Sequence, residues 1–143
     1  MRMLILSVAV LLSILAVSCR SDDEKSKRTP DNQRMSFHIG KIVELNAPSV
    51  GKIDTLIPIK IVLQFSNGCG QFHKFIETRK DEVVFIETEV SYRKSICTQN
   101  MPKHTSYYDF TPTRRGLHEF RFITKARGIN KFDTIPVLID VHE

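Results

Sequence analysis

Two cysteines, a methionine and two histidines are the side chains in this sequence best suited to bind a metal ion or carry redox chemistry. Cys97, Met101 and His104 follow one another closely along the chain, and Cys69 and His73 form a second close pair. Thiolate, thioether and imidazole groups are ligands that copper and zinc accept. The two cysteines can instead bond to each other, so the pattern allows either a metal site or a disulfide.

A third cysteine, Cys19, stands at the end of an apolar leader. Arg2 gives the leader a positive head, and residues 4–17 form an apolar run that only two serines interrupt. A run of about 14 apolar residues is typical of a signal-peptide core and is too short to span a bilayer comfortably. We therefore predict that residues 1–18 are a signal peptide.

The junction Leu15-Ala16-Val17-Ser18-Cys19 resembles the bacterial lipobox, in which small residues precede a cysteine that is lipidated and becomes the first residue of the mature protein. Ala16 stands where the lipobox usually has leucine, and Leu15 lies one step earlier. The resemblance implies a lipid on Cys19 that anchors the protein to a membrane. The alternative is an ordinary signal peptide cut near Ser18, which would leave Cys19 as a free thiol.

Residues 20–24, RSDDE, resemble the acidic surface-export signal of Bacteroidota-type lipoproteins. The resemblance implies an outer-membrane lipoprotein exposed on the cell surface, and the alternative is a periplasm-facing anchor behind a charged linker. Residues 19–33 contain no apolar side chain able to join a core beyond Cys19, which predicts a disordered tether. About 15 flexible residues span roughly 20 Å.

Lipidation of Cys19 would leave Cys69 and Cys97 as an even pair in an oxidising compartment, which favours a disulfide between them. The metal alternative would add His73, Met101 and His104. In blue-copper loops the ligand order is cysteine, histidine, methionine, and the order here differs. A cysteine enzyme needs a free thiolate beside a base, so we expect no enzymatic activity and no cofactor.

Period-two alternation of apolar and polar residues dominates residues 34–143 and predicts β-strands. Seven strands are expected, at 34–45, 56–66, 71–79, 82–92, 105–111, 117–124 and 133–141. In the fourth of these, Val84, Ile86 and Val90 are predicted to face the core, with Glu89 on the other face. Seven short strands separated by turns predict a two-sheet sandwich as a single domain.

The segment from Tyr108 to Phe120 resembles the late strands of bacterial immunoglobulin-like domains, which often read aromatic-x-Phe, Pro, then Gly-x-Tyr-x-Phe. His118 replaces the tyrosine, and the sequence has no tryptophan. The resemblance implies an all-β, immunoglobulin-like antiparallel sandwich. An Asn-Gly-Cys-Gly turn paired with a later Ile-Cys-Thr also resembles uncharacterised Bacteroidota-type lipoproteins, which carry no activity across.

If successive strands alternate in direction, the loops carrying Cys69 and Cys97 share the end where the tether enters. The opposite end then collects basic side chains, namely Lys52, Arg79, Lys80, Arg114 and Arg115. These form a candidate surface for an anionic partner, and the alternative is a set of ordinary solvated turns. The net charge of +5, or +4 without the leader's Arg2, is too small to indicate a nucleic-acid partner.

These observations predict a membrane-anchored lipoprotein that acts as a non-enzymatic binding module for an unknown protein or glycan. Its membrane contact would be the lipid on Cys19. The alternative function is a metal- or redox-handling lipoprotein that uses Cys69, Cys97, Met101 and His104. Counting thiols with and without reductant separates the two.

Overall fold

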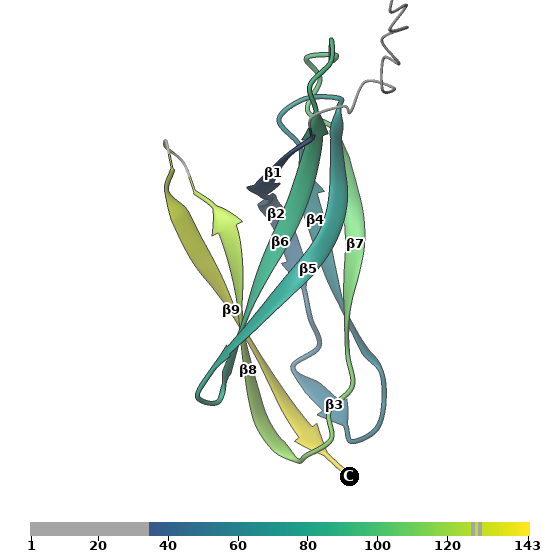
Figure 1. Cartoon of the computed structure of the whole chain (residues 1–143). Helices are drawn as coiled ribbons and strands as arrows, with labels where there is room; N and C mark the ends of the chain where they lie inside the picture. Colours follow the sequence, from purple (N-terminus) through teal and green to yellow (C-terminus); the bar gives the residue numbers. More distant parts are fainter. Residues whose placement is uncertain (1–34, 127, 129) are drawn as a thin grey trace, which may run out of the picture. The chain divides into compact units, whose positions relative to one another are not determined.

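The alternating apolar residues fold into two β-sheets, which a computed structural model describes for residues 35–126, 128 and 130–143 (Figure 1). The strands are β1 (Met35–Ile39), β2 (Lys41–Asn46), β3 (Val50–Lys52), β4 (Ile57–Gln64), β5 (Gly70–Lys80), β6 (Val83–Arg93), β7 (Lys103–Phe110), β8 (Gly116–Lys125) and β9 (Phe132–His142). The described residues contain no helix. The predicted signal peptide, Cys19 and the tether lie outside the described residues.

The larger sheet is built around β6. Strand β5 pairs along one edge of β6, while β1 and β8 share the other edge, and the sheet continues through β9 to β3. The smaller sheet contains β2, β4 and β7. The predicted all-β, two-sheet sandwich is therefore confirmed.

The sequence analysis expected antiparallel pairing throughout, and this expectation is wrong. Strands β6 and β8 are parallel, and so are β3 and β9. The chain leaves β6 for β7 in the smaller sheet and then returns to the larger sheet as β8. Since successive strands alternate in direction, β6 and β8 point the same way and meet as a parallel pair.

The predicted first strand, 34–45, is in fact two strands in different sheets, and the chain changes sheet at Gly40. The Gly40 N–H donates to the Thr88 carbonyl at 2.7 Å, and the Gly40 carbonyl accepts from the Lys125 N–H at 3.2 Å. A Cβ at position 40 would lie 3.1 Å from Val90 Cγ1 and 3.2 Å from Leu63 Cδ2. Glycine therefore allows the backbone to cross between the sheets at this close approach.

A second difference is the short strand β3, which lies where the sequence analysis expected a loop. Val50 to Lys52 pair in parallel with Asp140 to His142 at the end of β9. Three residues give no periodicity to detect, so only the partner strand reveals this element. The described residues thus form nine strands, whereas the sequence analysis expected seven.

The core lies between the two sheets. Ile59 and Ile61 of β4 are fully buried, as are Phe122 of β8 and Ile139 of β9. Each large apolar side chain buried in this way contributes about 2 kcal/mol before conformational entropy is counted. The core is therefore made of facing apolar rows from both sheets.

The inward face predicted for 82–92 is confirmed at Ile86 and Val90, which are 0% and 1% exposed. Val84 is only half-buried. Ser91, which shares the face of Glu89, is 2% exposed, because its neighbours in β1 and β5, Phe37 and Gln71, flank it on both sides.

Strand β5 contains an irregularity that resolves a conflict in its sequence. Phe72 and Phe75 are out of phase for a regular strand, yet both pack against the core with ring centroids 4.9 Å apart. The register with β6 shifts between Phe72 and Lys74, which is a β-bulge. The extra residue, His73, stays exposed on the outer face.

Candidate binding site

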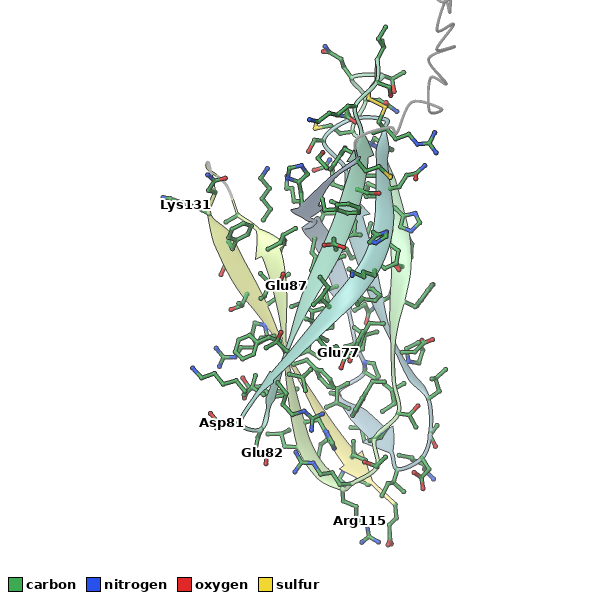
Figure 2. All side chains as sticks on the ribbon, viewed as in Figure 1. Glu77, Asp81, Glu82, Glu87, Arg115 and Lys131 are labelled. Atoms are coloured by element: carbon green, nitrogen blue, oxygen red, sulfur yellow. A yellow bond between two sulfur atoms is a disulfide. The ribbon has the colours of Figure 1, made fainter. Side chains whose placement is uncertain are left out.

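The predicted basic residues lie at the end of the sandwich opposite the disulfide. Arg79 and Lys80 end β5, and Figure 2 shows Asp81, Glu82 and Arg115 in the lower part of the molecule. Strand β6 runs from this end to Arg93, and its eleven residues span about 33 Å. We call this the distal end, since Met35, where the described chain starts, pairs with Arg93 at the other end.

Acidic side chains are mixed with the bases at the distal end. Arg114 forms an ion pair with Glu82, and Arg115 forms one with Glu143. Lys52 pairs through its backbone with His142 in β9. These exposed ion pairs add little stability, but they offset the positive charge of both arginines. The sequence already indicates acidic side chains at this end, since Asp81-Glu82 directly follows Lys80.

A small cavity opens at the distal end between β5–β6 of the larger sheet and β7 of the smaller one. We call it the distal cleft; its volume is about 120 Å³. Its lining includes the aromatic residues Tyr108, Phe110 and Phe120 and the polar residues Glu77, Arg79, Glu82, Arg114 and His118. A single side chain or sugar substituent fits this space, which equals roughly four water volumes.

The apolar base of the distal cleft is rigidly packed. Tyr108 and Phe120 are 7% and 1% exposed. The Phe110 ring lies 4.8 Å from the Phe120 ring and 5.1 Å from the His118 ring. His118 Nε2 lies 3.0 Å from the Arg114 carbonyl oxygen, which fixes the connection between β7 and β8 against the cleft.

Burial raises the pKa of Tyr108 well above its usual range, and the carboxylate of Glu77 raises it further. The hydroxyl therefore stays protonated at any physiological pH and remains a hydrogen-bond donor. The cleft thus combines a neutral phenol hydroxyl beside Glu77 with carboxylate and guanidinium groups.

The sequence analysis named Arg79 and Arg114 as candidate binding residues. It did not predict that Glu77 and His118 line the same cleft. Four different strands and two connections contribute the lining, so no linear spacing could reveal it. Lys52, Lys80 and Arg115 are not among the lining residues.

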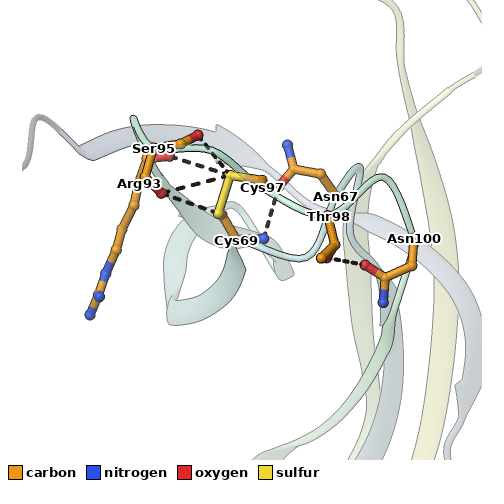
Figure 3. The surroundings of a disulfide bond; sticks show 7 residues. All are labelled: Asn67, Cys69, Arg93, Ser95, Cys97, Thr98 and Asn100. Atoms are coloured by element: carbon orange, nitrogen blue, oxygen red, sulfur yellow. Dashed lines mark hydrogen bonds between the residues drawn. A yellow bond between two sulfur atoms is a disulfide. The ribbon is translucent and has the colours of Figure 1, made fainter.

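At the opposite end, Cys69 and Cys97 form a disulfide with a Cα–Cα distance of 5.5 Å (Figure 3). The prediction of this bond is confirmed. The Gly68 N–H donates to the Thr98 carbonyl at 2.9 Å, and the Cys69 N–H donates to Asn67 Oδ1 at 2.9 Å. The bond and these contacts hold the β6–β7 connection against the turn before β5.

The disulfide contradicts the use of Cys69 and Cys97 as metal ligands, because neither sulfur is free as a thiolate. His104 stacks on Phe65 with ring centroids 5.9 Å apart, and Met101 is 61% exposed. His73 Nε2 instead lies 3.7 Å from Glu89 Oε1. Within the described part of the chain, no three His, Cys, Asp or Glu side chains cluster as a metal site requires.

Comparison with known proteins identifies the fold family. In the described ranges, no helix has the length and apolar character needed to cross a membrane. Searches of curated proteins and of solved structures found no match. Residues 59–130 match the ORF11 beta-sandwich domain. The matched segment runs from within β4 to beyond β8 and contains both bonded cysteines and Tyr108. Because the match covers half of the sequence, the chain belongs to the ORF11 beta-sandwich domain family.

Proposed function

We propose that this protein is a membrane-anchored lipoprotein of the bacterial envelope that acts as a non-enzymatic binding module for a protein or glycan. The observation that carries the proposal is the distal cleft. It lies about 30 Å along β6 from Arg93, which pairs with Met35 at the start of the first strand after the tether. A module held by its N-terminus would present this cleft away from the membrane.

The anchor is supported by residues 15–19, which resemble a lipobox, and by residues 20–24, which resemble a surface-export signal of Bacteroidota-type lipoproteins. The Cys69–Cys97 disulfide fits an oxidising compartment outside the cytoplasm. We propose the outer membrane, with the domain on the cell surface, as its location; a periplasm-facing anchor is the alternative.

The chemistry of the cleft supports a polar partner with some apolar surface. Arg79 and Arg114 offer fixed donors, Glu77 offers acceptors, and the aromatic base offers an apolar platform. A protein side chain and a sugar hydroxyl with its ring face both fit these groups. Lys52, Lys80 and Arg115 would add long-range attraction for an anionic partner around the cleft.

We further propose that the sandwich is immunoglobulin-like. Strand β2 pairs with β4, and β3 then pairs in parallel with the last strand, β9, so the N-terminal segment contributes to both sheets. The Tyr108–Phe120 resemblance also supports this assignment. The parallel pair β6–β8 departs from the purely antiparallel sheets of an immunoglobulin domain.

Binding at the cleft is tested by adding a panel of monosaccharides and short peptides to the isotope-labelled full chain in nonionic-detergent micelles. We expect amide resonance shifts at Tyr108, Arg114 and His118 with members of one class. Arg114→Ala should weaken that binding about tenfold, the loss of one charge-assisted hydrogen bond. Lys60→Ala is the control, since Lys60 pairs with Glu44 at 2.9 Å and neither side chain lines the cleft. Shifts in neither class, or equal weakening by both variants, would overturn the proposal.

A further inference from the structure

A second recess lies at the disulfide end, where the chain changes sheet at Gly40. We call it the switch groove; its volume is about 280 Å³. The lining residues that carry the inference are His38, Lys41, Gln64, Tyr92 and Lys125. Lys125 reaches this place because its N–H donates to the Gly40 carbonyl, directly before Lys41. The crossing of the backbone therefore sets two lysines beside one recess.

The switch groove differs from the distal cleft in its charge. None of the described side chains that line it is acidic, whereas carboxylates and guanidinium groups are mixed in the distal cleft. Two acidic residues on neighbouring strands have basic partners outside the groove. Glu44 accepts a hydrogen bond from Lys60 Nζ at 2.9 Å, and Glu89 lies 3.8 Å from Lys74 Nζ on the other face of β6. The two lysines of the groove therefore have no carboxylate partner among its lining.

The remaining lining supplies fixed hydrogen-bonding groups. The Tyr92 hydroxyl accepts from the Ser66 N–H at 3.0 Å, which holds the phenol ring in place. The His38 ring lies edge-on to the Tyr92 ring with centroids 5.8 Å apart. Lys41 Nζ donates to Gln64 Oε1 at 3.1 Å, so its ammonium group is directed along the groove and retains two further donors.

We propose that the switch groove binds a phosphate group. A phosphate monoester carries between about −1.5 and −2 charges at neutral pH, which matches two lysine ammonium groups better than the single charge of a carboxylate does. Lysine binds phosphate as a point charge, and His38 can donate to a third oxygen. The phosphate can belong to a soluble ester or to a lipid headgroup. The proposal is independent of the function of the distal cleft.

The test uses the isotope-labelled full chain in nonionic-detergent micelles with three probes, namely inorganic phosphate, glycerol phosphate and phosphatidic acid mixed into the micelles. We expect saturable shifts of the His38, Lys41 and Lys125 resonances. Lys41→Gln with Lys125→Gln should weaken binding at least about tenfold, since two charge-assisted contacts are lost. Lys74→Gln with Lys131→Gln removes the same charge outside the groove and should change binding by less than about twofold, within ordinary surface effects.

The probes also separate the two sources of phosphate. Saturation by glycerol phosphate at the same concentration as by phosphatidic acid supports a soluble phosphate ester, and much tighter binding of the lipid supports a headgroup. Unshifted resonances at His38 and Lys41 with all three probes would overturn the proposal. Equal weakening by the groove variant and the control variant would do so as well. Amide dispersion in each spectrum verifies that the variants are folded.

Discussion

The Cys69–Cys97 bond joins residues 28 positions apart and ties the β6–β7 connection to the turn before β5. Closing a loop of this length restricts the unfolded chain and is worth about 3–4 kcal/mol in loop-closure entropy. We therefore expect replacement of both cysteines by serine to lower the free energy of unfolding by that amount, measured by urea titration. Ser95→Ala, next to both sulfurs, should cost less than about 1 kcal/mol. A double variant as stable as the parent would contradict a structural role.

Tyr108 predicts how stability depends on alkaline pH. Burial and Glu77 raise the pKa of Tyr108 in the folded state above the usual tyrosine value of 10.0. Above about pH 10 the unfolded chain loses the phenol proton while the folded chain keeps it. Ionisation therefore stabilises the unfolded state relative to the folded state. The stability contribution is thus present below pH 10 and is lost as the pH rises. Urea unfolding between about pH 9 and 11 should show a fall that is smaller in Tyr108→Phe; identical slopes would refute the assignment.

At the scale of an element, β6 is the strand on which the larger sheet depends, because it pairs with β5 on one edge and with β1 and β8 on the other. Its neighbouring residues Val90 and Glu89 face opposite sides. Val90→Asp would bury an unpaired charge at a position 1% exposed and should cost several kcal/mol. Glu89→Gln removes only contacts near 3.7 Å to His73 and Lys74 and should cost less than about 1 kcal/mol. Melting temperatures decide this, and equal values would show that the register is wrong.

For the whole molecule, the proposed arrangement is a lipid on Cys19, a tether and a sandwich that presents the distal cleft. Replacing Cys19 by alanine should abolish incorporation of an alkyne-tagged fatty acid and release the protein from the membrane fraction, because a lipid chain supplies the anchoring free energy. Ser21→Ala, two residues beyond, should remain labelled and membrane-bound. A Cys19→Ala protein that stays uncut and membrane-bound would show that the lipoprotein assignment is wrong.

The class of fold and the disulfide were predictable from the order of the residues alone. Alternation along residues such as Ile57, Ile59 and Ile61 is a local property, because side chains of a strand point to alternate faces wherever the strand lies. The disulfide was predictable because cysteine pairing depends on a count and on alternating strand directions. The sequence analysis placed basic side chains at the distal end but did not include the acidic side chains that pair with Arg114 and Arg115.

Features that depend on contacts between distant segments could not be predicted before the fold was known. The sheet change at Gly40 depends on Val90 and Leu63 in both sheets, and β3 exists through its pairing with β9. The β-bulge that turns both Phe72 and Phe75 inward is set by the β6 register. Both recesses are lined by residues from several strands, whose proximity follows from strand order. Periodicity specifies which face of a strand is buried, but strand order is decided by packing between elements, and packing has no local signature in the sequence.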